Sequence, residues 1–173
     1  QVTIGRETFT VPDPFLVLAT QNPIETEGTY ALPEAQVDRF MLKVLVGYPS
    51  PTEEFVIVER MTGTLEPVRK VLTTTQLVGL QQEAAKVYTD PALIEYAIKL
   101  VNATRTPKDV GLQEIQPYIT FGASPRASIN LVLAGRSLAF VRGRSYTLPQ
   151  DILDMALDVM RHRLVLSYEA LSD

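Results

Sequence analysis

The hydrophobic pattern of this 173-residue chain changes near residue 65, and that change constrains the fold more than any other feature. Before it, short apolar runs alternate with proline and glycine turns, which is typical of β-strands. After it, apolar residues recur every three or four positions, which is typical of amphipathic helices. The charge changes at the same place, because residues 1–65 carry 4 basic and 9 acidic groups whereas residues 66–173 carry 12 and 11. We therefore predict an N-terminal part, residues 1–64, and a helical part, residues 65–173.

The N-terminal part is predicted to contain a hairpin and two buried strands. Gly5-Arg6 lies between alternating apolar and polar residues and suits a two-residue type II′ turn. The continuous apolar runs at 15–19 and 41–46 suit strands that are covered on both faces, as in a parallel sheet. The sequence therefore predicts part of an α/β fold.

Two helices are expected in the same part. Residues 33–38 suit a short helix with proline at its first position. Ser50-Pro51-Thr52-Glu53 is a capping box, which satisfies backbone N–H groups at the beginning of a longer helix. That helix is expected to bury Phe55, Val58 and Met61 or their neighbours.

The helical part is predicted to contain four helices. The first spans about 75–88, and Asp90-Pro91 begins the second. Ser124-Pro125 begins the third, and residues 147–150 begin the fourth. The connection at 106–122 is long for a helix bundle, and such length is often associated with function.

Composition excludes several classes of protein. The chain carries 16 basic and 20 acidic residues, so general nucleic-acid binding is not expected. It has no cysteine and one histidine, which excludes a disulfide scaffold, a thiolate zinc site and a histidine-rich metal centre. No apolar run reaches the roughly 18 residues of a membrane span, and no secretory signal is found, so we expect the cytoplasm. Because Gln1 directly precedes a predicted strand, we also expect the sequence to be a fragment.

Asn22 is the first candidate site residue. It follows the first predicted buried strand, and ligands of open parallel sheets bind outside that end. A side-chain amide there can orient a water molecule or contact a phosphate. The alternative is that Asn22 closes an Asn-Pro turn, and its immediate neighbours alone favour this interpretation.

Arg39 is the second candidate, and it follows Asp38 between the short helix and the second predicted strand. An arginine at a subunit edge can neutralise charge on a transferring phosphoryl group. A local surface pair between Asp38 and Arg39 explains the same residues, and composition alone favours that pair.

Arg126 is the third candidate. With Ser124 as the N-cap and Pro125 next, Arg126 lies in the first turn of a helix, where the helix dipole disfavours a cation. An arginine beside exposed N–H groups suits a phosphate. The alternative is an exposed arginine paired with a carboxylate, and the sequence does not decide between the two.

Two further observations limit the chemistry. His162 lies between two arginines, so a structural or partner-facing role is expected rather than general-base catalysis. No lysine follows a glycine, so the phosphate-binding loop G-x-x-x-x-G-K-[ST] is absent. No Asp-Glu pair follows an apolar strand, so the usual magnesium-holding carboxylates are absent as well.

Several segments, taken together and in order, resemble the MoxR family of AAA+ ATPases. The segments that carry the resemblance are Ala19–Pro23, Glu27–Tyr30, Leu32–Gln36, Asp38–Phe40, Gly122–Ala127, Arg161–Leu164 and Leu166–Ala170. They extend over nearly the whole chain. The resemblance implies a partial P-loop AAA+ core with parallel strands and a hairpin in residues 1–64. It implies an all-α helical lid in residues 65–173, with the two Walker motifs upstream of the sequence.

The resemblance also implies roles for the three candidates. Asn22 would be sensor 1, which helps place the water that attacks the γ-phosphate. Arg39 would be the arginine finger that serves a neighbouring subunit's ATP. Arg126 would be sensor 2, which reaches from the lid to the phosphates of its own subunit.

At the level of the whole protein, the resemblance implies an ATP hydrolase that uses ATP and Mg²⁺, whereas this chain alone is expected to be inactive and to bind neither tightly. It implies a ring, commonly a hexamer, that remodels or activates client enzymes together with von Willebrand factor A domain proteins. A stand-alone helical docking module and a subunit of a magnesium-chelatase-like machine are the alternatives.

Overall fold

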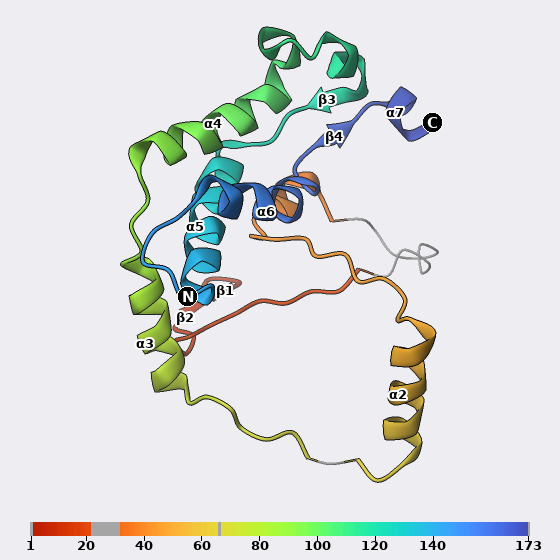
Figure 1. Ribbon diagram of the computed structural model, residues 1–173, viewed down its shortest axis with the longest axis vertical. Coiled ribbons are helices and arrows are strands. Elements are labelled where there is room, and N and C mark those ends of the chain that lie inside the picture. Colours follow the sequence, from red (N-terminus) through yellow and green to blue (C-terminus); the bar gives the residue numbers. More distant parts are fainter. Residues whose placement is uncertain (1, 22–31, 66, 173) are drawn as a thin grey trace.

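The computed structural model describes residues 2–21, 32–65 and 67–172, and it shows a mixed α/β chain in which helices predominate (Figure 1). Antiparallel pairs of strands form two small sheets, and the longer helices lie mainly in the second half of the sequence. The strands are β1 (Val2–Ile4), β2 (Glu7–Phe9), β3 (Ile119–Phe121) and β4 (Val165–Leu166). The helices are α1 (Glu34–Val37), α2 (Pro51–Thr62), α3 (Thr74–Ala85), α4 (Pro91–Arg105), α5 (Pro125–Val141), α6 (Pro149–Met160) and α7 (Tyr168–Ser172), with 3-10 helices η1 (Pro107–Val110) and η2 (Gln113–Tyr118).

The predicted hairpin at the beginning of the chain is confirmed. Strands β1 and β2 pair antiparallel, with Val2 opposite Phe9 and Ile4 opposite Glu7. Gly5 has φ +64°, and no residue other than glycine has a positive φ in the part of the chain that is described. A positive φ at only the first central position is what a type II′ turn requires.

The two buried parallel strands predicted in the N-terminal part are absent. Neither 15–19 nor 41–46 is paired as a strand, and both runs are largely exposed, with Leu18 85% and Val46 92% accessible. A strand needs a neighbour to accept and donate its backbone hydrogen bonds, and no described segment runs beside either of these two as a strand. An apolar run therefore predicts the capacity to form a buried strand and not the strand itself.

Helix α2 forms as predicted but does not bury its apolar face. The capping box is present, since the Ser50 N–H donates to Glu53 Oε2 at 2.8 Å and the Glu53 N–H donates to Ser50 Oγ at 3.4 Å. All twelve residues are exposed, so the predicted burial of Phe55, Val58 and Met61 is wrong. Figure 1 shows the reason, because α2 stands apart from the other helices.

The four helices predicted in the helical part are confirmed as α3, α4, α5 and α6. Asp90 caps α4, because its Oδ1 accepts the Ala92 N–H at 2.8 Å. Ser124 caps α5, because its Oγ accepts the Arg126 N–H at 3.3 Å. The long connection at 106–122 is ordered by η1, η2 and β3, and β3 pairs with β4 near the end of the chain.

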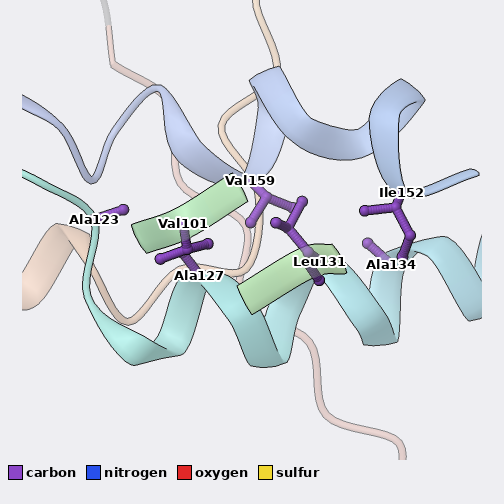
Figure 2. Packing of buried hydrophobic residues seen from close by; sticks show 8 residues of the cluster. Val101, Ala123, Ala127, Leu131, Ala134, Ile152 and Val159 are labelled. Carbon is purple, nitrogen blue, oxygen red and sulfur yellow. The ribbon is translucent and has the colours of Figure 1, made fainter. Parts of the chain in front are cut away.

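The hydrophobic core lies where α4, α5 and α6 meet (Figure 2). Leu131 on α5 and Ile152 on α6 are completely buried. Gly135 on α5 permits the close approach of these two helices, because a Cβ at this position would lie 2.7 Å from Ile152 Cδ1. The buried members of the cluster are Ala97, Val101, Ala123, Ala127, Leu131, Ala134, Ile152 and Val159. Among the described residues, no helix is long and apolar enough to cross a membrane.

Candidate functional site

The site is built around Arg126 at the beginning of α5, and the last turn of α4 holds the loop that leads to it. The Ala123 N–H donates to Thr104 Oγ1 at 3.0 Å, and Arg105 Nε donates to the Ala123 carbonyl at 2.7 Å. The loop approaches α4 so closely that a Cβ on Gly122 would lie 2.5 Å from the Thr104 carbonyl oxygen. Only glycine fits there without displacing the backbone. Gly122 therefore sets the position of the loop from which α5 begins, and with it the position of Arg126.

Arg126 pairs with Asp38, which lies 88 positions earlier in the sequence. Its Nη1 donates to Asp38 Oδ2 at 2.8 Å, and the Arg126 side chain is still 56% exposed. The hydroxyl of Ser124 also donates to the same carboxylate, to Oδ1 at 2.8 Å. The carboxylate partner that the sequence left open for Arg126 is therefore present.

A second arginine, Arg163, reaches Asp38 from beyond the end of α6. Its Nε donates to Asp38 Oδ1 at 3.1 Å, and its side chain is fully buried. Burial disfavours ionisation of Asp38, but hydrogen bonds from Arg126 and Ser124 and the charge of Arg163 outweigh it. They hold the pKa of the Asp38 carboxyl below its usual value. Asp38 is therefore a carboxylate at neutral pH that joins two arginines of the helical part.

Arg39 follows Asp38 directly, and its side chain is exposed. The Asp38–Arg39 surface pair considered from the sequence is not present, because Asp38 binds Arg126 and Arg163 instead. Within the described ranges, Arg39 makes a backbone hydrogen bond to the Gln36 carbonyl but no side-chain ion pair. The structure thus holds the backbone at Arg39 and leaves its guanidinium group accessible.

Asn22 lies outside the described residues. Of the other two candidates, Arg126 is bonded to Asp38, and Arg39 is the residue that follows Asp38. Sequence reasoning gave neither Asp38 nor Arg163 a place in a site. No signal in one sequence identifies their pairing, because the two residues lie 125 positions apart and charged residues are common along the chain.

His162 is a structural residue, as the sequence analysis expected. Its Nε2 lies 2.9 Å from the Phe40 carbonyl oxygen, so the ring donates from Nε2. Burial is the main reason that the pKa of His162 is lowered, and the charges of Arg163 and Lys43 lower it further. Its Nδ1 is buried and has no hydrogen-bond partner among the described residues, which suits a neutral ring.

A separate ion-pair cluster lies at the start of α6 and provides a structural comparison. Asp151 is completely buried, and Arg144 binds both of its carboxylate oxygens, at 2.8 and 2.5 Å. Arg142 adds a bond of 2.9 Å, and the Leu148 N–H donates to the carboxylate at 2.8 Å as the helix cap. These partners lower the pKa of Asp151 despite its burial. Arg142, Arg144 and Leu148 lie in the connection between α5 and α6, and Asp151 lies in the first turn of α6, so these contacts are local.

The described residues contain no group of three His, Asp or Glu side chains that is suited to a metal ion. The site is cationic, because the half-exposed Arg126 is bonded to the Asp38 carboxylate and the exposed Arg39 follows Asp38 directly in the sequence. Exposed guanidinium groups suit a phosphate, which accepts charge-assisted hydrogen bonds from them.

Comparison with protein families and solved structures finds matches to both parts of the chain. Residues 1–42 match the ATPase family associated with various cellular activities (AAA), and residues 112–173 match the AAA lid domain. A crystal structure of a candidate ATPase from Cytophaga hutchinsonii, at 2.00 Å resolution, is similar with a TM-score of 0.92 and 44% sequence identity. The similarity covers 99% of this chain and 52% of that one.

Three relatives match most of this chain in sequence. Chaperone MoxR1 of Mycobacterium tuberculosis is 52% identical over 99% of this chain and 46% of its own length. YeaC of Bacillus subtilis, an uncharacterised protein, is 38% identical over 98% of this chain and 51% of its own. Protein MoxR of Paracoccus denitrificans is 34% identical over 87% of this chain and 48% of its own. The chain thus spans about half the length of the relatives it matches.

Proposed function

Because the chain belongs to the MoxR family of AAA+ proteins, we propose that it supplies the phosphate-sensing arginines of a longer MoxR-type ATPase. The observation that carries this proposal is the grouping around Asp38. The carboxylate is bonded to Arg126 from the helical part, and it is followed directly by the exposed Arg39. In this proposal residues 1–64 belong to the AAA+ core, and residues 65–173 form the lid.

The side chains of the two arginines suit the phosphate groups of ATP. The bond that is hydrolysed belongs to ATP. Arg126 is 56% exposed, and it is bonded to one oxygen of a carboxylate that a phosphate oxygen can replace. Arg39 is exposed, and its side chain has no ion-pair partner in the described ranges. We propose that Arg39 acts as the arginine finger and Arg126 as sensor 2. Charge that develops on the transferring phosphoryl group is what such arginines stabilise.

Magnesium is a different case. The described residues offer no cluster of carboxylates for Mg²⁺, so we derive no step through it from this chain. Asn22 belongs to the segment Ala19–Pro23 that resembles the family's sensor 1 motif, and we propose that role for it on the resemblance alone.

The position of Arg126 bears on which nucleotide it contacts. From the sequence we expected Arg126 to serve its own subunit, whereas Arg39 serves a neighbour. Arg126 is hydrogen-bonded to the carboxylate of Asp38, the residue that precedes Arg39, so this bond ties the Arg126 side chain to the segment that carries Arg39. This arrangement favours one shared phosphate group, and we propose that both arginines act on the neighbour's ATP.

Subunit mixing tests both parts of the proposal in the full-length protein. We expect Arg39→Ala and Arg126→Ala each to lower ATP hydrolysis strongly while ATP binding is largely kept. Each variant is then mixed with subunits whose own phosphate-binding lysine is replaced. An arginine that acts on a neighbour's ATP restores hydrolysis in the mixture, because the lysine variant still donates it. Wild-type hydrolysis by Arg39→Ala would refute the finger role. If hydrolysis did not recover in the mixture that contains Arg126→Ala, Arg126 would act on the ATP of its own subunit instead.

The biological role follows the family. We propose a cytoplasmic, ring-forming ATPase, commonly hexameric, that remodels or activates client enzymes together with von Willebrand factor A domain proteins. The relative named as a chaperone supports this role. Co-purification of a client that depends on ATP tests it, and capture that is independent of ATP and of both arginines would favour a docking module instead.

A further inference from the structure

Arg163 is the most completely bonded arginine side chain near the candidate site, and it does not belong to the phosphate-sensing pair. We propose that Arg163 is a positioning residue for Arg39: it holds the backbone on both sides of Arg39 against the lid and thereby sets where the Arg39 guanidinium group points. This inference rests on the proposed role of Arg39.

The first argument is how the buried guanidinium group is satisfied. An arginine carries five N–H donors, and burying it without partners is costly. Arg163 is fully buried and makes five hydrogen bonds. Besides the Asp38 carboxylate and the Val159 carbonyl of α6, it donates to three backbone carbonyls of one short segment. These acceptors are Asp38 O at 3.0 Å, Phe40 O at 2.5 Å and Met41 O at 3.3 Å.

The second argument is the position of those carbonyls along the chain. Two of them, from Asp38 and Phe40, belong to the residues immediately before and after Arg39. A guanidinium group is planar and rigid, so donors from one plane fix the relative positions of the peptide groups they bind. The Arg39 side chain makes no hydrogen bond or ion pair within the described residues. Its backbone is held while its side chain stays accessible.

Further contacts hold the same segment to the end of α6. His162 Nε2 binds the Phe40 carbonyl at 2.9 Å, so this oxygen accepts hydrogen bonds from two adjacent residues. The Lys43 N–H donates to the Asp158 carbonyl at 2.8 Å. Leu42 packs against the hydrophobic core of the helical part. Movement of the lid would therefore carry Arg39 with it.

The ion-pair cluster at Asp151 shows what a purely structural arginine looks like in this chain. Arg144 binds the buried Asp151 carboxylate and the Tyr146 carbonyl, and all of these groups lie between residues 144 and 151. None of its contacts reaches the segment that presents Arg39. Arg144 is therefore a control for Arg163, because each arginine combines hydrogen bonds to an aspartate carboxylate with hydrogen bonds to backbone carbonyls, and only those of Arg163 reach that segment.

A double-mutant cycle in the full-length protein tests the proposal. Arg163→Lys keeps the charge but loses the fork that binds several carbonyls. We expect kcat for ATP hydrolysis to fall about tenfold to a hundredfold, because small misplacements of a reacting group have effects of that size. The KM for ATP and the assembly state should stay close to wild type. The residual hydrolysis of Arg39→Ala is followed with γ-labelled ATP. In that background, adding Arg163→Lys should cause no further fall in kcat.

The control variant, Arg144→Lys, should behave differently from Arg163→Lys. Arg144→Lys should lower the melting temperature yet leave kcat near wild type in both backgrounds. Wild-type kcat for Arg163→Lys, or an equal fall with and without Arg39, would overturn the positioning role. Wild-type hydrolysis by Arg39→Ala would instead refute the proposed function.

A milder variant covers the case in which Arg163→Lys does not stay folded. His162→Ala removes one of the two donors to the Phe40 carbonyl. It should lower kcat about two- to tenfold, the equivalent of one hydrogen bond, and only when Arg39 is present. An equal fall without Arg39 would also overturn the proposal.

Discussion

Apolar residues are abundant in both parts of this chain, but only the helical part buries them. Leu131 and Ile152 are completely inaccessible, whereas Phe15, Leu18 and Phe55 of the N-terminal part are 56%, 85% and 68% exposed. The helices α4, α5 and α6 supply one another with apolar faces, and so each can close a core. The runs in the N-terminal part have no such partner among the described residues. Apolar residues therefore stabilise the fold only where a second surface covers them.

One segment of the N-terminal part does not follow this rule. Residues 38–43 are held by hydrogen bonds to Arg163, His162 and Asp158, and Leu42 packs on the core. In energetic terms this segment belongs to the helical part, although it precedes α2 in sequence. It is also the segment that carries Arg39, so the candidate site lies where the two parts of the chain meet.

The largest expected difference concerns the core itself. Leu131→Ala in this chain should lower the free energy of unfolding by about 2–5 kcal/mol, because it leaves a cavity between α5 and α6. The matched change Phe55→Ala on exposed α2 should stay within about 0.5 kcal/mol. Urea titration followed by circular dichroism measures both. A large effect of Phe55→Ala would mean that α2 has a packing partner and would remove the contrast.

A pair of glycines gives a sharper test, with effects of opposite sign. Gly122→Ala should destabilise by about 1–3 kcal/mol, because its Cβ would meet the backbone of Thr104 and Arg105 at 2.5 and 2.7 Å. Gly79→Ala on α3 should stabilise by about 0.4–1 kcal/mol, since nothing lies within 4 Å of its Cβ. Thermal melting of both variants checks the signs. Two changes of equal sign would contradict the close approach of the Gly122 loop to α4.

The smallest expected effect is a dependence of stability on pH through His162, which is the chain's single histidine. Its pKa is lowered in the folded state, first because of burial, so the unfolded chain binds a proton more readily. Stability should be complete above the unfolded pKa of about 6.5 and should decline as the pH falls from there through the folded pKa. Urea titrations at pH 7.5 and 5.5 measure the decline. In His162→Gln it should vanish, and an unchanged decline would assign it to other groups.

Local signals in the sequence predicted local structure well. The Gly5-Arg6 turn, the capping box at Ser50 and the caps Asp90 and Ser124 all form as expected. Each depends on residues only a few positions apart, so one sequence contains everything needed. The same is true of the four helices of the helical part, which form where their apolar spacing predicts them.

Signals that depend on distant residues failed. The runs at 15–19 and 41–46 looked like buried strands, but burial depends on what lies beside them, which their own residues do not specify. Arg126 was recognised as unusual, yet its partner Asp38 could not be found without the fold. Arg163 entered the sequence analysis only as one of the two arginines beside His162, and its hydrogen bonds around Arg39 became visible only in three dimensions.

Hydrogen exchange along the whole chain is the most direct test of the contrast between the two parts. Amides of α4, α5 and α6 should exchange slowly and share one opening free energy, because they enclose the common core. Amides of α2 should exchange nearly as fast as in a free helical peptide, since every residue of that helix is exposed. Protection in α2 equal to that in α5 would contradict the claim that only the helical part buries its apolar surface.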